Sequence, residues 1–266
     1  MPRQVTAFSN ATVKRLRSLR DKKHRREEGL FLAEGLRIVA EARDSGMLPE
    51  IVAFSPEGAR HPLAAEIIAA TETAGGEAIE TSPDILAKMS GKDNPQMLLG
   101  AYRQPASALD RIDRATAPLW IVAQALRDPG NIGTILRTGD AVGAGGLILA
   151  DDCVDPFSVE AVRASMGALF TVPIATARWT TFVKWLRTGP GELIGTSLNT
   201  EADYTAPVGA SPTFIVVGNE QSGLPLEYEA DCDRLVKMPM LGKADSLNAA
   251  VATAVMAYEV LRQRRG

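Results

Sequence analysis

The chain has 266 residues, which at about 150 residues per domain predicts two domains and is long enough to bury a core without staples. Its hydrophobic fraction of 45% and charged fraction of 23% are ordinary for a soluble globular protein. The formal net charge of −3, taken over the whole chain, argues against a nucleic-acid partner, because proteins that bind phosphate backbones usually carry a basic surface.

The charge is distributed unevenly along the chain. Residues 1–26, here called the basic arm, hold nine Lys and Arg residues against the single acid Asp21, a net charge of +8. The other 240 residues hold 20 basic and 31 acidic residues, a net charge of −11. A basic arm on an acidic body differs from a near-neutral protein, and it reopens the possibility of a nucleic-acid partner. The arm lacks the apolar core of a signal peptide, so we expect it to belong to the mature protein.

Several other classes of protein are excluded by simple counts. Cys153 and Cys232 lie in unrelated contexts, without a CxxC motif, which predicts two free thiols in a reducing compartment such as the cytoplasm. His24 and His61 have no ligand partners at a useful spacing, so we expect no metal site. No apolar run approaches the roughly 18–20 residues that a membrane span needs.

Short elements alternate in the first part of the chain. Val13, Leu16 and Leu19 recur at helical spacing within the basic stretch 10–26. Together with a brief apolar run at 30–32, the pattern predicts a small α/β domain over residues 1–106. Its further helices are expected at 35–43, 62–73 and 83–89, and its strands at 51–54, 77–80 and 97–102.

The stretch 104–118 is polar, with proline near both ends, and we place a linker at 107–117 before a second domain at 118–266. Strands and helices alternate regularly in this second domain, which predicts a mostly parallel sheet with helices on both faces. The expected strands are 119–126, 146–150, 192–198, 214–218 and 235–239, with a short element at 171–175 and helices at 132–142, 158–169, 180–187 and 245–264.

Four of the predicted strands run into loops of glycine, proline and short polar residues. These loops begin near positions 127, 195, 218 and 238. Ligands bind beyond the carboxyl ends of the strands in a sheet of this type, and glycine lets the backbone approach a ligand closely. The sequence therefore predicts a buried small-molecule site at this edge of the sheet.

Five polar residues in or beside these loops could carry chemistry, and each also has a plain structural reading. Asn131 and Ser246 could cap helices, Glu220 could cap a turn, and Arg137 could be a solvated helix charge. A carboxylate that directly follows a buried strand, such as Glu220, is more often functional than one on a helix surface. Asn248 is expected within the first turn of its helix, where Asn has no propensity advantage, and this favours a role for its side chain.

Three segments resemble the three motifs of the SpoU (TrmH-like) family of RNA ribose 2′-O-methyltransferases, within the SPOUT class. They are DPGNIGTILRTG at 128–139, IVVGNEQSGLP at 215–225 and KMPMLGKADSLNAAVATAVMAYE at 237–259. Their order and spacing agree with the family over residues 118–264. The sequence departs from the common pattern at Ala249-Ala250, where Val followed by Ser or Ala is frequent, and no proposed chemical role depends on that pair. The segment from Ser9 through LRDKKHRREEGLFLAEGLRIV resembles the ribosomal-protein-like substrate-binding domain of rRNA-directed members.

The resemblance implies S-adenosylmethionine as cofactor, a trefoil knot in the second domain, and a homodimer to which the long C-terminal helix contributes. The residues at the family's polar active-site positions are Asn131, Arg137, Glu220, Ser246 and Asn248. The cofactor-binding positions that the resemblance implies are Thr196, Ser197, Leu198, Gly218, Asn219, Gly223, Met238, Leu241 and Leu247.

The resemblance also gives the reaction, in which a methyl group passes from a sulfonium sulfur to a ribose 2′-oxygen. The family credits the counterpart of Arg137 with activating the hydroxyl, but a guanidinium almost never loses its proton. We therefore expect Arg137 to hold the adjacent phosphate and polarise the 2′-hydroxyl, with Asn131 and Glu220 orienting it.

The basic arm then has a function as a phosphate-binding surface, although a solvated helix face is the simpler reading. The expected RNA-binding residues are Lys14, Arg15, Arg17, Arg20, Lys22, Lys23, Arg25 and Arg26. Ribosomal RNA is the expected substrate, because tRNA-directed members can manage with shorter extensions. Two alternatives stay open: a tRNA 2′-O-methyltransferase, and a non-catalytic RNA-binding or assembly factor that retains the fold.

Overall fold

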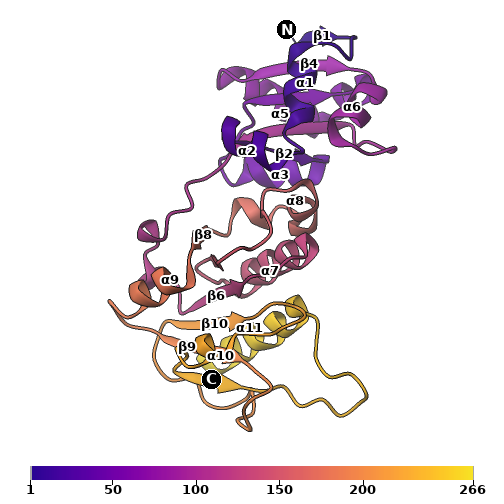
Figure 1. The fold of residues 1–266 in the computed structure, drawn as a ribbon. Helices are drawn as coiled ribbons and strands as arrows, with labels where there is room; N and C mark the ends of the chain where they lie inside the picture. The colour runs from indigo at the N-terminus through magenta and orange to yellow at the C-terminus, as the bar shows by residue number, and fades with distance from the viewer. Residues whose placement is uncertain (1, 266) are drawn as a thin grey trace. The chain divides into compact units, whose positions relative to one another are not determined.

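The computed structural model describes residues 2–265, which form two compact units (Figure 1). Residues 2–105 and 155–171 make the first unit, and residues 106–154 and 172–265 make the second. The segment 155–171 therefore groups with the first unit, whereas the sequence places it inside the domain at 118–266. Within the described residues, no helix is long and apolar enough to cross a membrane.

A five-stranded sheet forms the centre of the first unit, in the order β1-β4-β3-β5-β2. The strands β1, β4 and β3 are parallel, and β5 runs antiparallel to both of its neighbours. The sheet holds β1 (Arg3–Val5), β2 (Leu30–Glu34), β3 (Ile51–Phe54), β4 (Glu77–Thr81) and β5 (Leu98–Arg103). The helices are α1 (Ala11–Ser18), α2 (Lys22–Glu28), α3 (Leu36–Asp44), α4 (Pro56–Arg60), α5 (Pro62–Thr73), α6 (Pro83–Ser90) and α8 (Val159–Ser165), with a 3₁₀ turn at Ala168–Phe170.

The basic arm is folded into this unit. It supplies β1, whose three residues are too few to show a period in the sequence, and two helices where the sequence predicts one basic stretch. Asn10 and Asp21 cap these helices through their side chains, and Val13, Leu16 and Leu19 are buried in the apolar core beside Met89. The apolar spacing in the arm therefore reflects packing, and the charged residues occupy the remaining positions.

Aromatic side chains attach residues 155–171 to the first unit. Phe31 lies with its ring centroid 5.1 Å from that of Phe157, and Tyr102 lies 4.9 Å from Phe170. Helix α8 packs against β2 in the same region. The sequence predicts a helix there but gives no sign of its partner, because the apolar face of an amphipathic helix does not encode which sheet will cover it.

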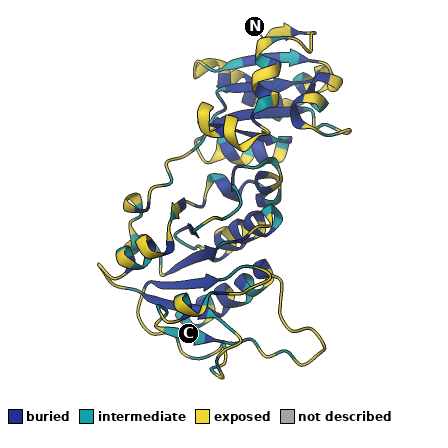
Figure 2. Ribbon diagram, viewed as in Figure 1, coloured by how far each residue is buried: buried dark blue, intermediate teal, exposed yellow. Residues whose placement is uncertain are grey.

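Six parallel strands form the second unit, in the order β11-β9-β10-β6-β7-β8. This confirms the predicted α/β architecture with a mostly parallel sheet. The inner strands read as continuous apolar runs because both faces of the sheet are covered, and Figure 2 shows these strands in dark blue. The strands are β6 (Leu119–Gln124), β7 (Leu147–Ala150), β8 (Ile174–Ala177), β9 (Glu192–Thr196), β10 (Thr213–Val217) and β11 (Arg234–Val236).

Helices cover both faces of this sheet. Trp179 and Phe182 of α9 join Trp120 and Phe214 in an aromatic core on one face. On the other face, α11 packs against α7, β10 and β6. The helices are α7 (Pro129–Val142), α9 (Trp179–Leu186), α10 (Leu226–Glu229) and α11 (Ala249–Arg265), with 3₁₀ turns at Leu109–Arg111 and Arg114–Thr116. Because α7 and α11 lie side by side, the loops that lead into them meet at one edge of the sheet.

Candidate functional site

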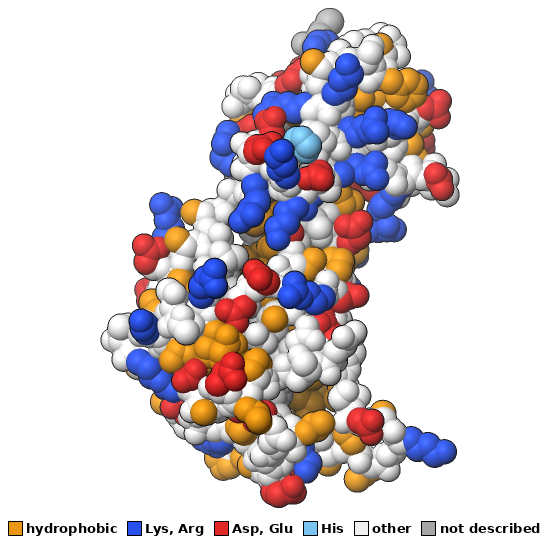
Figure 3. All heavy atoms as spheres, in the orientation of Figure 1, with side chains coloured by type: hydrophobic (Ala, Val, Ile, Leu, Met, Phe, Trp, Pro, Cys, Tyr) orange, Lys and Arg blue, Asp and Glu red, His pale blue; other side chains and the backbone are white. Residues whose placement is uncertain are grey.

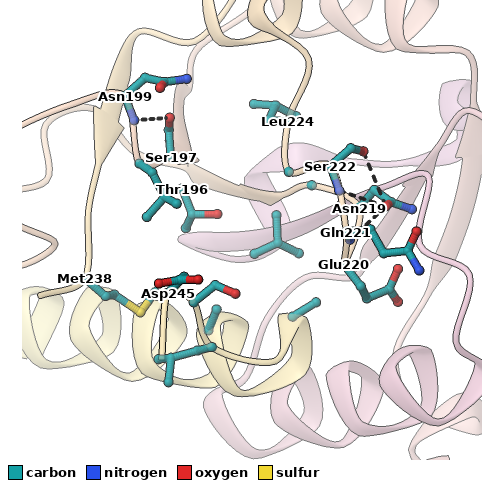
Figure 4. A pocket seen from close by; sticks show the side chains of 18 of the residues that line it. Thr196, Ser197, Asn199, Asn219, Glu220, Gln221, Ser222, Leu224, Met238 and Asp245 are labelled. Carbon is teal, nitrogen blue, oxygen red and sulfur yellow. Dashed lines mark hydrogen bonds between the residues drawn. The ribbon is translucent and has the colours of Figure 1, made fainter. Parts of the chain in front are cut away.

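A cavity of about 570 Å³ opens beyond the carboxyl ends of β9, β10 and β11, as expected for a parallel sheet (Figure 4). Three loops enclose it: 196–199, 217–224 and the segment that joins β11 to α11. Its lining is mixed, with polar loop residues facing apolar side chains such as Leu224 and Val236. A cavity of this size with a few convergent polar groups suits a small organic ligand.

The turn after β10 is held by its own hydrogen bonds. Asn219 and Gly223 exchange backbone hydrogen bonds of 3.1 and 2.9 Å, and the Asn219 side chain donates to the Ala125 carbonyl at 2.8 Å. Only glycine fits at position 218, because a Cβ atom there would lie 2.3 Å from the backbone of Gly223. Gly223 has a φ of +69°, which other residues rarely adopt. These glycines bring the backbone of the turn to the cavity wall.

Glu220 projects from this turn toward the start of α7. Its carboxylate accepts hydrogen bonds from the backbone N–H groups of Arg127 and Asp128, at 3.2 and 3.3 Å, and from Asn131 Nδ2 at 3.0 Å. Partial burial acts to raise the pKa of Glu220, but the hydrogen bonds from Asn131 and from backbone N–H groups outweigh it and lower that pKa. The group is therefore a carboxylate anion that orients the Asn131 amide.

The start of α7 differs from the sequence reading. Asp128, rather than Asn131, caps the helix by accepting the Asn131 N–H at 2.8 Å, so that the Asn131 side chain is released from capping. With its Nδ2 bound to Glu220, Asn131 uses its Oδ1 to accept a hydrogen bond from Asn248 Nδ2 at 2.9 Å. The capping interpretation of Asn131 is thus wrong, and the residue links two loops instead.

The start of α11 also differs. The helix begins at Ala249 and not near position 245, so Ser246 lies outside it and is not its cap. Asn248 is the cap, because its Oδ1 accepts the N–H groups of Ala250 and Val251 at 2.9 and 3.3 Å. The structure thus joins Glu220, Asn131 and Asn248 in one hydrogen-bonded chain.

Arg137 stands apart from this chain. It is exposed on α7, six residues beyond Asn131, or about 9 Å along the helix axis. Among residues 2–265, its guanidinium forms no hydrogen bond or ion pair, and it is not part of the cavity lining. A free guanidinium close to a polar cluster is available to an incoming anion.

Most positions predicted to hold the cofactor do line the cavity. Those that do are Thr196, Ser197, Leu198, Gly218, Asn219, Gly223, Met238 and Leu247, together with the active-site positions Glu220 and Ser246. Leu241 does not, and it is 98% exposed in the loop before α11. The loop before α11 therefore directs some of its side chains into the cavity and others into solvent.

Sequence reasoning missed Glu229, which also lines the cavity. It lies at the end of α10 and is 8% exposed. Its carboxylate accepts hydrogen bonds from Ser197 Oγ and from Asn199 Nδ2. It follows Glu227 and precedes Asp231 and Asp233 in an acidic stretch, and only its burial distinguishes it.

The basic arm presents cations on the surface of the first unit. Figure 3 shows Lys and Arg side chains gathered over the region of α1 and α2. A shallow hollow of about 500 Å³ lies there, lined by Lys14, Arg17, Ser18, Arg20, Asp21 and His24. All but one of the eight predicted RNA-binding residues are exposed.

Arg25 is the exception. Its side chain is 3% exposed, it forms an ion pair with Asp155 at 2.7 Å, and it donates to the carbonyls of Leu19 and Arg20. With its donors used inside the protein, Arg25 has no free group for a phosphate. The RNA-binding expectation therefore does not extend to this residue.

Two family models match successive parts of the chain, and the second of these parts includes the segment 155–171 that packs with the first unit. A model described as SpoU rRNA Methylase family matches residues 118–258, and a model of the MRM3-like substrate binding domain matches residues 10–100.

Three full-length similarities stand out. A 23S rRNA (uridine(2479)-2′-O)-methyltransferase of Streptomyces viridochromogenes is 31% identical over 98% of this chain and 93% of its own length. The 23S rRNA (guanosine(2553)-2′-O)-methyltransferase RlmP of Bacillus subtilis is 29% identical over 97% of this chain and 99% of its own length. The crystal structure of an AdoMet-bound rRNA methyltransferase from Sinorhizobium meliloti superposes with a TM-score of 0.91, at 38% identity over 98% of this chain and 97% of the other.

Proposed function

The chain belongs to the SpoU rRNA methylase family, as its three motifs predicted, and on that premise we propose that it is an S-adenosylmethionine-dependent methyltransferase acting on a ribose 2′-hydroxyl of ribosomal RNA. The observation that carries this proposal is the chain of hydrogen bonds from Glu220 through Asn131 to Asn248 at the edge of the cavity. This chain of hydrogen bonds contains one residue from each of the three motifs, and a protein that used the fold only to bind RNA would not need it.

The cavity fits S-adenosylmethionine. Its volume of about 570 Å³ suits a ligand of this size, and Gly218 admits the close backbone approach that adenosine recognition by main-chain groups needs. We propose that Thr196, Ser197, Leu198, Gly218, Asn219, Gly223, Met238 and Leu247 hold the cofactor. When bound, S-adenosylmethionine supplies the methyl group.

The residues beside the cavity would align the acceptor. We propose that Glu220, fixed as an anion, holds the Asn131 amide, and that Arg137 binds a phosphate next to the target ribose and polarises its 2′-hydroxyl. The guanidinium does not take the proton, because an arginine side chain already carries its full set of protons, so the proton passes to phosphate or water. Ser246, in the loop that lines the cavity, completes the polar surface.

The first unit would bind the RNA. Its exposed cations Lys14, Arg15, Arg17, Arg20, Lys22, Lys23 and Arg26 would contact phosphates, giving affinity that depends on salt and not on sequence. A separate substrate-binding unit of this size favours ribosomal RNA over tRNA. We propose that the protein acts on this substrate in the cytoplasm.

We further propose that the protein acts as a homodimer and that its second unit contains the trefoil knot. Val251 and Tyr258 on α11 are 49% and 53% exposed and lie two turns apart on the helix. Apolar side chains at this spacing form a stripe that a second copy of the helix could cover.

The decisive experiment is to incubate the protein with S-adenosylmethionine carrying a radioactive methyl group and with ribosomal RNA or tRNA, and to map the 2′-O-methylated positions. We expect one methylated ribose in ribosomal RNA, and no incorporation by an Arg137→Ala variant. Methylation of tRNA alone would support the alternative that the protein is a tRNA 2′-O-methyltransferase. Absence of both methylation and cofactor binding would instead identify an assembly factor.

A further inference from the structure

Glu229 is a buried carboxylate that faces the cavity. It is less than one-tenth exposed, and it ends the short helix α10, which follows directly on the turn after β10. Its Oε1 accepts hydrogen bonds from Ser197 Oγ at 2.5 Å and from Asn199 Nδ2 at 3.3 Å, and its Oε2 accepts from Asn199 Nδ2 at 3.2 Å. These contacts use part of the acceptor capacity of the carboxylate, which has about four lone-pair positions.

Among the residues that the structure describes, no Lys, Arg or His forms an ion pair with Glu229. The nearest charged positions in sequence are acids, at Glu227 and Asp231. Burying an anion with only neutral donors is costly, and such groups persist where they bind something. Because Glu229 lines the cavity, a ligand bound there can supply a further hydrogen-bond donor to its carboxylate.

The order of the strands separates Glu229 from the proposed reacting end of the site. Glu220 bonds to residues that follow β6, whereas Ser197 and Asn199 follow β9, and β10 lies between β6 and β9. Two strand spacings amount to about 10 Å. Figure 4 shows Ser197 and Asn199 on the opposite side of the cavity from Glu220. A ligand whose methyl group points toward Glu220 would therefore extend its other parts toward Glu229.

We propose that Glu229 is a cofactor-binding residue that accepts hydrogen bonds from an O–H or N–H donor of S-adenosylmethionine, either the ribose hydroxyls or the methionine ammonium group. This rests on the proposed function, because it takes S-adenosylmethionine as the ligand of the cavity. Ser197 and Asn199 hold the carboxylate in place for that contact. A carboxylate pair with a ribose diol is a common solution in nucleotide-binding sites, and an ammonium group would supply the absent cation.

The test is calorimetric binding by the full chain, without RNA. The ligands are S-adenosylmethionine, S-adenosylhomocysteine, 5′-methylthioadenosine, which lacks the amino acid, and 5′-methylthio-2′,3′-dideoxyadenosine, which also lacks the ribose hydroxyls. The variants are Glu229→Gln, which removes the charge at constant size, and Glu229→Asp, which keeps the charge but withdraws it. Glu227→Gln is the matched control, since it removes an exposed charge from the same helix.

We expect Glu229→Gln to weaken S-adenosylmethionine binding about tenfold or more, with Glu227→Gln unchanged. If a ribose hydroxyl is the donor, Glu229→Gln weakens the binding of 5′-methylthioadenosine by the same factor. It then leaves the affinity for the dideoxy compound unchanged, because that compound has no ribose hydroxyl to donate. If the ammonium is the donor, the loss affects S-adenosylmethionine and S-adenosylhomocysteine only. Either pattern supports the proposal and names the donor.

Two results would overturn it. The first is equal affinity of wild type and Glu229→Gln for every ligand. The second is a loss of affinity in Glu229→Gln that persists with the dideoxy compound, because Glu229 would then act only through the loop at 197–199. Should Glu229→Gln not fold, as judged by thermal unfolding without ligand, Glu229→Asp decides by the same comparisons. A wild-type protein that bound none of the ligands would instead refute the proposed function, and this inference with it.

Discussion

Asn131 donates a side-chain hydrogen bond to Glu220 across 3.0 Å, and this contact joins the first turn of α7 to the turn after β10. The two residues are 89 positions apart in the chain. The other end of the Asn131 amide accepts from Asn248, so one side chain fixes the relative positions of three loops. The geometry of the reacting end therefore depends on a small number of neutral and charge-assisted hydrogen bonds.

Asn248 combines two functions that substitutions can separate. Asn248→Ala removes both the cap of α11 and the bond to Asn131, and should cost about 1 kcal/mol of stability. Asn248→Ser keeps a capping oxygen but is too short to reach Asn131, so its stability should stay within a few tenths of wild type. Both should lose methylation activity to a similar extent. Urea unfolding and single-turnover methylation measure the two effects, and an active Asn248→Ser variant would contradict the role of the Asn131 contact.

Glu220 should make stability depend on pH in a defined direction. Its pKa in the folded protein lies below the usual 4.5, so its contribution is complete above about pH 4.5 and is lost as pH falls through the lower folded value. Wild type should therefore unfold at a higher temperature than Glu220→Gln at pH 7, and the gap should narrow below pH 4.5. Thermal unfolding of both proteins from pH 7 to pH 3 checks this. A gap independent of pH would show that the carboxylate charge is not what the site uses.

Arg137 should contribute to the chemical step and not to cofactor binding. Arg137→Ala should reduce the single-turnover rate by at least about 100-fold with saturating RNA and cofactor. Arg137→Lys should recover little of it, since a lysine ammonium cannot reproduce the planar fork of donors. Affinity for S-adenosylmethionine alone should be unchanged, because Arg137 lies outside the cavity lining. A near-normal rate in Arg137→Ala would rule out the proposed role.

Arg25 should behave as a structural residue. Arg25→Ala leaves Asp155, whose side chain is only 11% exposed, without its ion-pair partner and should cost on the order of 3 kcal/mol in the first unit. The neighbouring exposed Arg26→Ala is the control and should change stability by less than about 0.5 kcal/mol. Replacing both members of the pair, as in Arg25→Met with Asp155→Leu, should restore most of the loss, as measured by urea unfolding. Equal stability of the two single variants would contradict the buried pair.

The exposed cations of the basic arm should determine how RNA affinity responds to salt. Each phosphate contact contributes about 0.7–0.9 to the slope of log affinity against log salt concentration. Changing Lys14, Arg17, Lys22 and Lys23 to Gln should reduce the slope by about 3 for a ribosomal RNA fragment. Filter binding at salt concentrations from about 50 to about 300 mM would measure this slope, because salt changes the affinity strongly in that range. An unchanged slope would show that these side chains do not contact RNA phosphates and form only a solvated helix face.

The sequence predicts the sheet of the second unit well, because strands such as Leu119–Gln124 and Thr213–Val217 are mostly apolar, are buried throughout, and lead into loops that contain glycine. It fails where a residue's role depends on a distant partner. Arg25 resembles its neighbours in sequence, and its partner lies 130 residues away. Helix α11 starts later than its periodicity indicates because Leu247 fits the apolar stripe, although Asn248 supplies the cap. Glu229 could not be recognised, since its burial arises from the fold and not from its short helix.

Because the segment 155–171 belongs to the first unit, more than one stretch of chain connects the two units. The chain passes between the units near residue 105, again near 154 and once more near 171, so cutting the linker alone leaves two covalent connections intact. A fragment ending at the linker would lose Asp155, Phe157 and Phe170, and would expose Arg25 and the ring of Phe31 to water. The substrate-binding unit is thus not a detachable module in the covalent sense. Limited proteolysis at the linker should leave a nicked protein that still migrates as one species until it is denatured.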